Sequence, residues 1–190
     1  GGQFSQIAPL SFAAGRLRFA DTLFSSARYI VCSVDSLLAP FPGSTLTVER
    51  LRATDRQAQY LIITAAQFAA ESDQYAAFIR QQYGVDTRVV TVENIYDNYS
   101  YGVFNPEAIK VFLFDTWTTW TQKPPQNVFL VGDANYNYKA APSPQSKNFV
   151  PSYGFPVSDI WFVAFDAPAL EPSYAIGRLT AHSGSEVLAY

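Results

Sequence analysis

The oxygen-bearing side chains with the most suggestive spacing are Asp133, Asn135 and Asn137. Alternate positions in such a run offer three oxygen ligands from one short loop, as the first half of a calcium-binding loop does. The pattern is incomplete, because its sixth position is Tyr138 where that loop needs glycine, and its twelfth is Pro144 where it needs glutamate. The alternative is that these side chains bind loop amides and fix a tight turn.

Asp133 also follows a buried apolar run, and ligands gather beyond the carboxyl ends of the strands in open α/β sheets. A phosphoacceptor or magnesium site at this point needs further carboxylates after the first strand. The segment Thr64-Ala65-Ala66 stands there instead, and the sequence holds no Gly-rich phosphate loop. The sequence therefore disfavours phosphoryl or nucleotide chemistry.

The chain has only one cysteine, Cys32, and one histidine, His182, and this limits the thiol and imidazole chemistry that it can support. A zinc site of the usual composition needs about four such ligands, and a disulfide needs two cysteines, so this chain alone provides neither. Cys32 alternates with Ile30 and Val34 in a strand-like run, which favours a small buried hydrophobe over a reactive thiolate. Small polar residues surround His182, which favours a solvated loop position.

Composition and charge exclude several classes of protein. Of the 190 residues 48% are apolar and 15% are charged, which is typical of a folded domain and not of a disordered chain. The net charge of −3, without a long basic run, argues against nucleic acid as a partner. No apolar run approaches the roughly 18 residues that a membrane span requires, so no span is expected.

The strands that must position these residues alternate with helices between residues 60 and 133. Short apolar runs predict buried parallel strands. They lie at residues 60–64, 85–92, 127–131 and 174–179. This order predicts an α/β fold with an open, mostly parallel sheet and helices on both faces, of the flavodoxin or caspase-like type.

Two helices are expected between these strands. The first runs over residues 65–83, with Thr64 as its N-cap and Gly84 as the glycine that ends it. The second begins at Asn105-Pro106-Glu107, a strong start signal, and ends before Lys123. Its predicted core face carries Ile109, Phe112, Leu113 and Trp117.

The sequence divides near residue 55. Residues 1–55 have strand-like runs and no helical periodicity, which predicts a β-rich linker or the tail of an upstream domain, whereas residues 56–190 form the α/β domain. Residues 159–166 are expected to form a strand or hairpin arm. A helix that begins near Ser183 has no C-cap signal, which indicates that the chain is a piece of a longer protein.

In their order and spacing, the segments from residue 56 to 190 resemble the gingipain-type cysteine peptidases, peptidase family C25, above all the branch with the sortase-like peptidase of the type IX secretion system. The resemblance is carried by Tyr60-Leu61-Ile62-Ile63-Thr64, Val89-Val90-Thr91-Val92-Glu93-Asn94-Ile95-Tyr96-Asp97, Tyr99-Ser100-Tyr101-Gly102, Pro106-Glu107-Ala108-Ile109-Lys110-Val111-Phe112-Leu113, Leu130-Val131-Gly132-Asp133, Val150-Pro151-Ser152-Tyr153, Ser158-Asp159 and Ile176-Gly177-Arg178-Leu179, with Glu186 following.

The resemblance implies a catalytic domain of two caspase-like subdomains, of which residues 56–190 are the first. In that family the catalytic His and Cys belong to the second subdomain, so no catalytic residue is assigned here, and neither Cys32 nor His182 matches one. The implied role is a scaffold, inactive alone, for the downstream catalytic subdomain of a secreted or cell-surface cysteine endopeptidase.

The implied substrate of the parent is a protein or peptide. A non-catalytic C25-like module for binding or secretion is the alternative that the resemblance leaves open. Structural calcium in some family members also favours calcium at the Asp133 loop, as the one cofactor expected.

Overall fold

The computed structural model describes residues 10–20, 29, 43, 47–53, 56–137, 148–154, 156–165 and 171–190. The chain divides into two compact units, Gly1–Thr45 and Leu46–Tyr190. Cys32 lies outside the described residues, as does most of the strand-like run around it. The boundary predicted near residue 55 stays a prediction, but Leu51 is buried in the core of the second unit.

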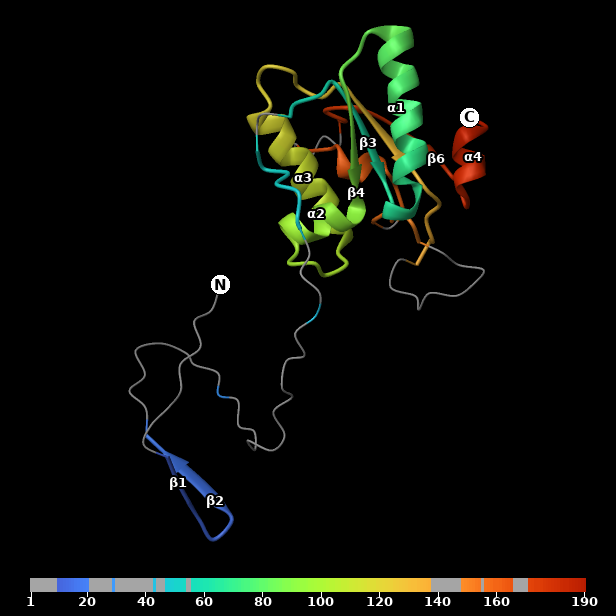
Figure 1. Ribbon diagram of the computed structural model, residues 1–190. Coiled ribbons are helices and arrows are strands. Elements are labelled where there is room, and N and C mark those ends of the chain that lie inside the picture. Colours follow the sequence, from blue (N-terminus) through green and yellow to red (C-terminus); the bar gives the residue numbers. More distant parts are fainter. Residues whose placement is uncertain are drawn as a thin grey trace. The chain divides into compact units, whose positions relative to one another are not determined.

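The described part of the first unit contains a hairpin of β1 (Leu10–Ala13) and β2 (Arg16–Phe19), drawn in blue in Figure 1. The strands pair antiparallel, and the turn residues Ala14 and Gly15 both have positive φ, at 50° and 73°. Positive φ at both turn positions is typical of a two-residue hairpin turn. The hairpin falls within residues 1–55, where the sequence shows strand-like runs.

The second unit is built on four parallel strands in the order β4-β3-β5-β6 (Figure 1). Their bounds are β3 (Tyr60–Thr64), β4 (Thr87–Thr91), β5 (Asn127–Val131) and β6 (Ala175–Leu179). The two central strands, β3 and β5, are apolar and almost wholly buried, because helices cover both faces of the sheet. The predicted α/β fold class is confirmed.

Helices are shared between the two faces. One face is covered by η2 (Ala66–Phe68), α1 (Ala69–Tyr83) and α4 (Gly184–Leu188), which pack on Ile62, Phe129 and Val131. The other is covered by α2 (Val92–Tyr99), α3 (Pro106–Thr119) and η3 (Ile160–Phe162), which pack on Leu61, Ile63 and Leu130. None of the helices in the described residues is long and apolar enough to cross a membrane.

Two helix ends confirm their sequence signals. Gly84 ends α1 in the left-handed conformation, with φ of 64° and its N–H donating to the Arg80 carbonyl. Asn105 caps α3 by accepting a hydrogen bond from the Glu107 N–H, and Pro106 is the first helical residue. These local rules held because each concerns groups within one turn of the chain.

Other local predictions were wrong. The Thr64 hydroxyl is buried and donates to the Val131 carbonyl at 3.0 Å, so Thr64 ties β3 to β5 and caps no helix. The second strand ends at Thr91, whose hydroxyl caps α2, and Val92 is already helical. On α3, Trp117 is 42% exposed, outside the core face.

The expected arm at residues 159–166 is also different. Its described part forms the short helix η3 at residues 160–162, which contacts α3, and Asp166 lies outside the described residues. The aromatic side chain of Phe162 is fully buried beneath the sheet. Burial against α3 therefore explains the apolar run that suggested a strand.

Candidate functional site

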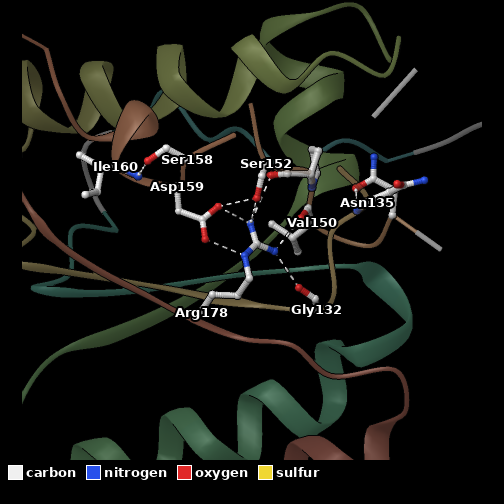
Figure 2. Close-up of polar contacts among 10 residues, drawn as sticks. Gly132, Asn135, Val150, Ser152, Ser158, Asp159, Ile160 and Arg178 are labelled. Carbon is white, nitrogen blue, oxygen red and sulfur yellow. Dashed lines mark hydrogen bonds and ion pairs between the residues drawn. The ribbon is translucent and has the colours of Figure 1, made fainter. Parts of the chain in front are cut away.

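The carboxyl end of the sheet is organised by Arg178, which projects from β6 (Figure 2). Its guanidinium forms a two-pronged ion pair with Asp159, from Nε to Oδ2 at 2.8 Å and from Nη2 to Oδ1 at 2.7 Å. Nη1 donates to the carbonyl oxygens of Gly132 and Val150, each at 2.7 Å. Nη2 also lies within hydrogen-bond distance of the Pro151 carbonyl and the Ser152 hydroxyl. We call these residues the Arg178 clamp.

The clamp is an ion pair with little access to water. The Arg178 side chain is 10% exposed and that of Asp159 is 24% exposed. Burial alone raises the pKa of the Asp159 carboxyl, but the hydrogen bonds and charge of Arg178, together with the Ser152 hydroxyl, outweigh it and hold the pKa below its usual value. Asp159 is therefore ionised at neutral pH, and the planar fork of arginine suits this geometry.

The clamp holds the segment at residues 149–150 over the carboxyl end of β5. The carbonyl of Asp133 accepts hydrogen bonds from the N–H groups of Phe149 and Val150, at 2.9 and 3.3 Å. Arg178 holds the same segment through the Val150 carbonyl. Gly132, with φ of 135°, makes this approach possible because a Cβ there would lie 2.8 Å from the Cβ of Phe149.

The three residues of the predicted calcium site lie at this edge and are engaged with protein groups. The Asn135 side-chain oxygen accepts from the Asn137 N–H at 3.1 Å, and the Asn135 N–H donates to the side chain of Asn148 at 3.3 Å. The Asp133 Oδ2 lies 3.1 Å from His182 Nε2. The hydrogen bond from the Asn137 N–H to the Asn135 side chain fixes a tight turn, which is the alternative to calcium binding that the sequence left open.

His182 stands between two carboxylates. Its Nε2 faces Asp133, and its Nδ1 lies 3.5 Å from Glu186 Oε2. The side chain is 60% exposed, which agrees with the solvated loop position expected from the sequence. The backbone N–H of His182 also donates to the Glu186 carboxylate, and this hydrogen bond is the main cause of the lowered pKa of Glu186. In the part of the chain that the structure describes, no group of three or more His, Cys, Asp or Glu side chains is placed to hold a metal ion.

Sequence reasoning identified Asp133 but not the Arg178 clamp. Arg178, Ser152 and Asp159 belong to the short segments that carry the family resemblance, but no role was assigned to any of them. The sequence does contain one indication of the clamp. Arg178 is the single charged residue in an otherwise uncharged strand, and such a residue needs a buried partner. The sequence did not indicate which acid would supply it.

A parallel α/β sheet with a polar cluster beyond its carboxyl ends defines the class of α/β proteins that build their sites from strand-end loops. Residues 53–190 match the family model described as "Peptidase family C25". That match covers most of the chain, so the protein belongs to peptidase family C25, as its sequence segments predicted.

A solved structure shows the same fold. Dimeric latent PorU from Porphyromonas gingivalis is similar with a TM-score of 0.53 and 19% sequence identity, over 70% of this chain and 15% of that chain. At this identity the similarity concerns the fold, and the present chain spans only about 15% of the PorU chain. Comparison with curated proteins gave no significant match.

Proposed function

We propose that this module is the N-terminal scaffold subdomain of a C25 cysteine endopeptidase, whose catalytic His and Cys come from another part of the parent protein. The observation that carries the proposal is that the family-matched residues, 53–190, include no cysteine. A cysteine peptidase needs a thiolate next to a base and donors for the oxyanion. The matched region supplies a folded α/β sheet and one imidazole, but no thiol.

The proposed partner is the downstream catalytic subdomain of the same parent, and the proposed substrate is a protein or peptide. The small share of the PorU chain that this module matches supports a larger parent. We further propose that the parent is secreted or lies at the cell surface. The scarcity of cysteine is consistent with an oxidising environment.

The proposal predicts that the 190-residue chain shows no thiol-dependent cleavage of peptides. The measurement is cleavage of a broad fluorogenic peptide library with and without reductant. An active cysteine peptidase serves as the positive control. Cys32→Ala should give the same blank result. Turnover by the natural chain that disappears in Cys32→Ala would refute the scaffold role.

Inactivity of this piece is also expected of a non-catalytic C25-like module for binding or secretion. The parent sequence separates the two, because an active member of family C25 is expected to carry its catalytic His in a Gly-His-Gly segment, with the catalytic cysteine after it, beyond the matched region. Their presence, followed by loss of activity when that cysteine is replaced by alanine, would support the endopeptidase. A parent that lacks both would support the binding module.

Calcium at Asp133, Asn135 and Asn137 is proposed as a structural cofactor. The donor set is entirely oxygen, which suits calcium. In this structure the Asn135 oxygen serves a loop amide and Asp133 faces His182, so a bound ion would need the imidazole to turn away.

The expected result is that calcium raises the melting temperature of chelator-treated protein, and that Asp133→Ala abolishes the rise. Asp73→Ala is the matched control, because it removes a carboxylate from the exposed face of α1 and should keep the rise. The measurement is a thermal melt with calcium or with magnesium. An unchanged melting curve for the natural chain in excess calcium would remove the proposal.

A further inference from the structure

A strip of aromatic side chains along α1 is largely uncovered, and we call it the aromatic strip. It consists of Tyr75, Phe78 and Tyr83. Ring centroids lie 6.4 Å apart for Tyr75 and Phe78, and 6.5 Å apart for Phe78 and Tyr83. Phe78 is 52% exposed, and Tyr83 is exposed as well. Neither the packing of the module nor the proposed scaffold role accounts for this apolar surface.

The strip is uncovered because α4, the helix beside it, is much shorter than α1. The two helices lie side by side and point in the same direction (Figure 1). At 1.5 Å per residue, the 5 residues of α4 span about 7.5 Å, whereas the 15 residues of α1 span about 22 Å. The start of α4 packs on the first turn of α1, since a Cβ at Gly184 would collide with Glu71. α4 therefore ends beside the first half of α1.

The last residue of the chain lies in the groove between these two helices. The Tyr190 ring stacks on Phe129 of β5, with centroids 5.7 Å apart, and its centroid lies 6.0 Å from that of Tyr75. A residue bonded to Tyr190 has its Cα about 3.8 Å away, so it begins beside the aromatic strip. The groove has a volume of about 240 Å³ and is lined by Gln74, Tyr75, Phe78, Val187, Leu188 and Tyr190.

The backbone of α4 is set to continue as a helix at this point. Its start is capped, because the Ser183 side chain accepts from the Glu186 N–H and the Glu186 carboxylate accepts from the His182 N–H. At the other end Ala189 is still in the right-handed helical conformation, with φ of −79° and ψ of −13°, and its N–H donates to the Ser185 carbonyl. Many helices are closed by a left-handed residue, as α1 is, and α4 has none at this position.

We propose that the aromatic strip is the docking surface for the segment that follows Tyr190 in the parent protein, and that this segment extends α4 by two to three turns. The inference rests on the proposed function, in which a further subdomain of the same parent follows these residues. About 15 Å of α1 lies beyond the end of α4, and a helix of about ten residues spans that distance. The segment is expected to be amphipathic, with its apolar face on Phe78 and Tyr83.

The position of Tyr190 favours this occupant over the others. A segment bonded to Tyr190 has an effective concentration of roughly millimolar at the groove, well above that of a second copy of the chain in dilute solution. The body of the catalytic subdomain is joined to this module through the same segment. It therefore reaches the strip only after the first residues that follow Tyr190 have passed it.

The first test is the parent sequence after Tyr190. Val187 is the buried residue of α4, so helical spacing places the first, fourth and eighth positions after Tyr190 on the same face. Apolar residues are expected at two or more of these positions, without proline in the first two turns. Fewer than two apolar residues, a proline in those turns, or a parent that ends at Tyr190 would overturn the proposal.

The second test compares the 190-residue chain with the chain extended by the next fourteen residues of the parent. The extended chain is expected to melt several degrees higher. Phe78→Glu should abolish this rise, because docking would bury an unpaired carboxylate. Phe114→Glu is the matched control and should keep the rise. Phe114 is 45% exposed on α3 and, like Phe78, contacts two neighbouring aromatic rings.

Hydrogen exchange locates the contact without relying on a variant. The amides of residues 79–83 at the end of α1 should exchange more slowly in the extended chain, and those of residues 115–119 on α3 should not change. Equal melting temperatures with and without the extension would overturn the proposal, and so would a rise that Phe78→Glu keeps. A dimer of the 190-residue chain that Phe78→Glu dissociates, without any gain from the extension, would show that a second copy is the occupant and would refute it.

These outcomes are independent of the proposed peptidase. An active parent whose extension gives no Phe78-dependent rise would refute the docking surface and leave the scaffold role standing. A parent that lacks the catalytic His and Cys, but whose extension gives the rise, would refute the endopeptidase and support the docking surface.

Discussion

Replacing Arg178 with methionine is expected to lower the free energy of unfolding by about 3 kcal/mol or more, because the change leaves a largely buried carboxylate without its partner. Methionine keeps most of the apolar stem, so the loss reports on the guanidinium. Three carbonyl groups and the Ser152 hydroxyl also lose a donor. Urea denaturation followed by circular dichroism measures the difference.

The matched control is Arg56→Met. Arg56 also forms an ion pair, with Glu49 at 3.0 Å, but its side chain is 67% exposed. An exposed pair contributes little, so this variant should stay within about 0.5 kcal/mol of the natural chain. Adding Asp159→Leu to Arg178→Met should recover part of the stability, since it removes the stranded charge. Equal losses for Arg178→Met and Arg56→Met would contradict the role given to the clamp.

Gly132→Ala is expected to cost about 2–3 kcal/mol. Two penalties act at once, because φ of 135° is a conformation that L side chains rarely adopt, and a new Cβ would lie 2.8 Å from the Cβ of Phe149 and 3.3 Å from Cγ2 of Val150. The segment at residues 149–150 must move to relieve the contact. The hydrogen bonds from its N–H groups to Asp133 should then weaken.

Gly84→Ala separates the two penalties. Gly84 also has positive φ, at 64°, but nothing lies within 4 Å of a Cβ placed there. This variant should therefore lose only about 1 kcal/mol, the cost of the left-handed backbone. Hydrogen exchange at Phe149 and Val150 provides a local measurement, and it should accelerate in Gly132→Ala but not in Gly84→Ala. Equal stability losses would show that crowding at Gly132 contributes nothing.

The sequence predicted the framework of this protein because the framework depends on local patterns. Residues 61–63 and 128–131 are uniformly apolar, as strands covered on both faces must be. Asn105-Pro106 and Gly84 mark helix ends through contacts within one turn. The boundary at Val92 was missed because a β-branched apolar residue fits both the end of a strand and the start of a helix.

The clamp was not predictable in the same way. Arg178 contacts residues that precede it by 19 to 46 positions, and no periodicity links those positions. Asp159 becomes the partner of Arg178 only because the folded chain brings residues 159 and 178 together at the end of the sheet. The pairing of His182 with Asp133 is similar, because it needs β5 and β6 to be neighbours before the two side chains can meet.

The same long separation has a kinetic consequence. β3, α1 and β4 are consecutive, so their contacts close short loops, whereas the clamp closes only after β5 and β6 lie side by side. Interactions that form after the rate-limiting step of folding slow the reverse reaction and leave the forward one almost unchanged. We therefore expect Arg178 to lengthen the lifetime of the folded state, and thereby its resistance to proteolysis, without making the chain fold faster.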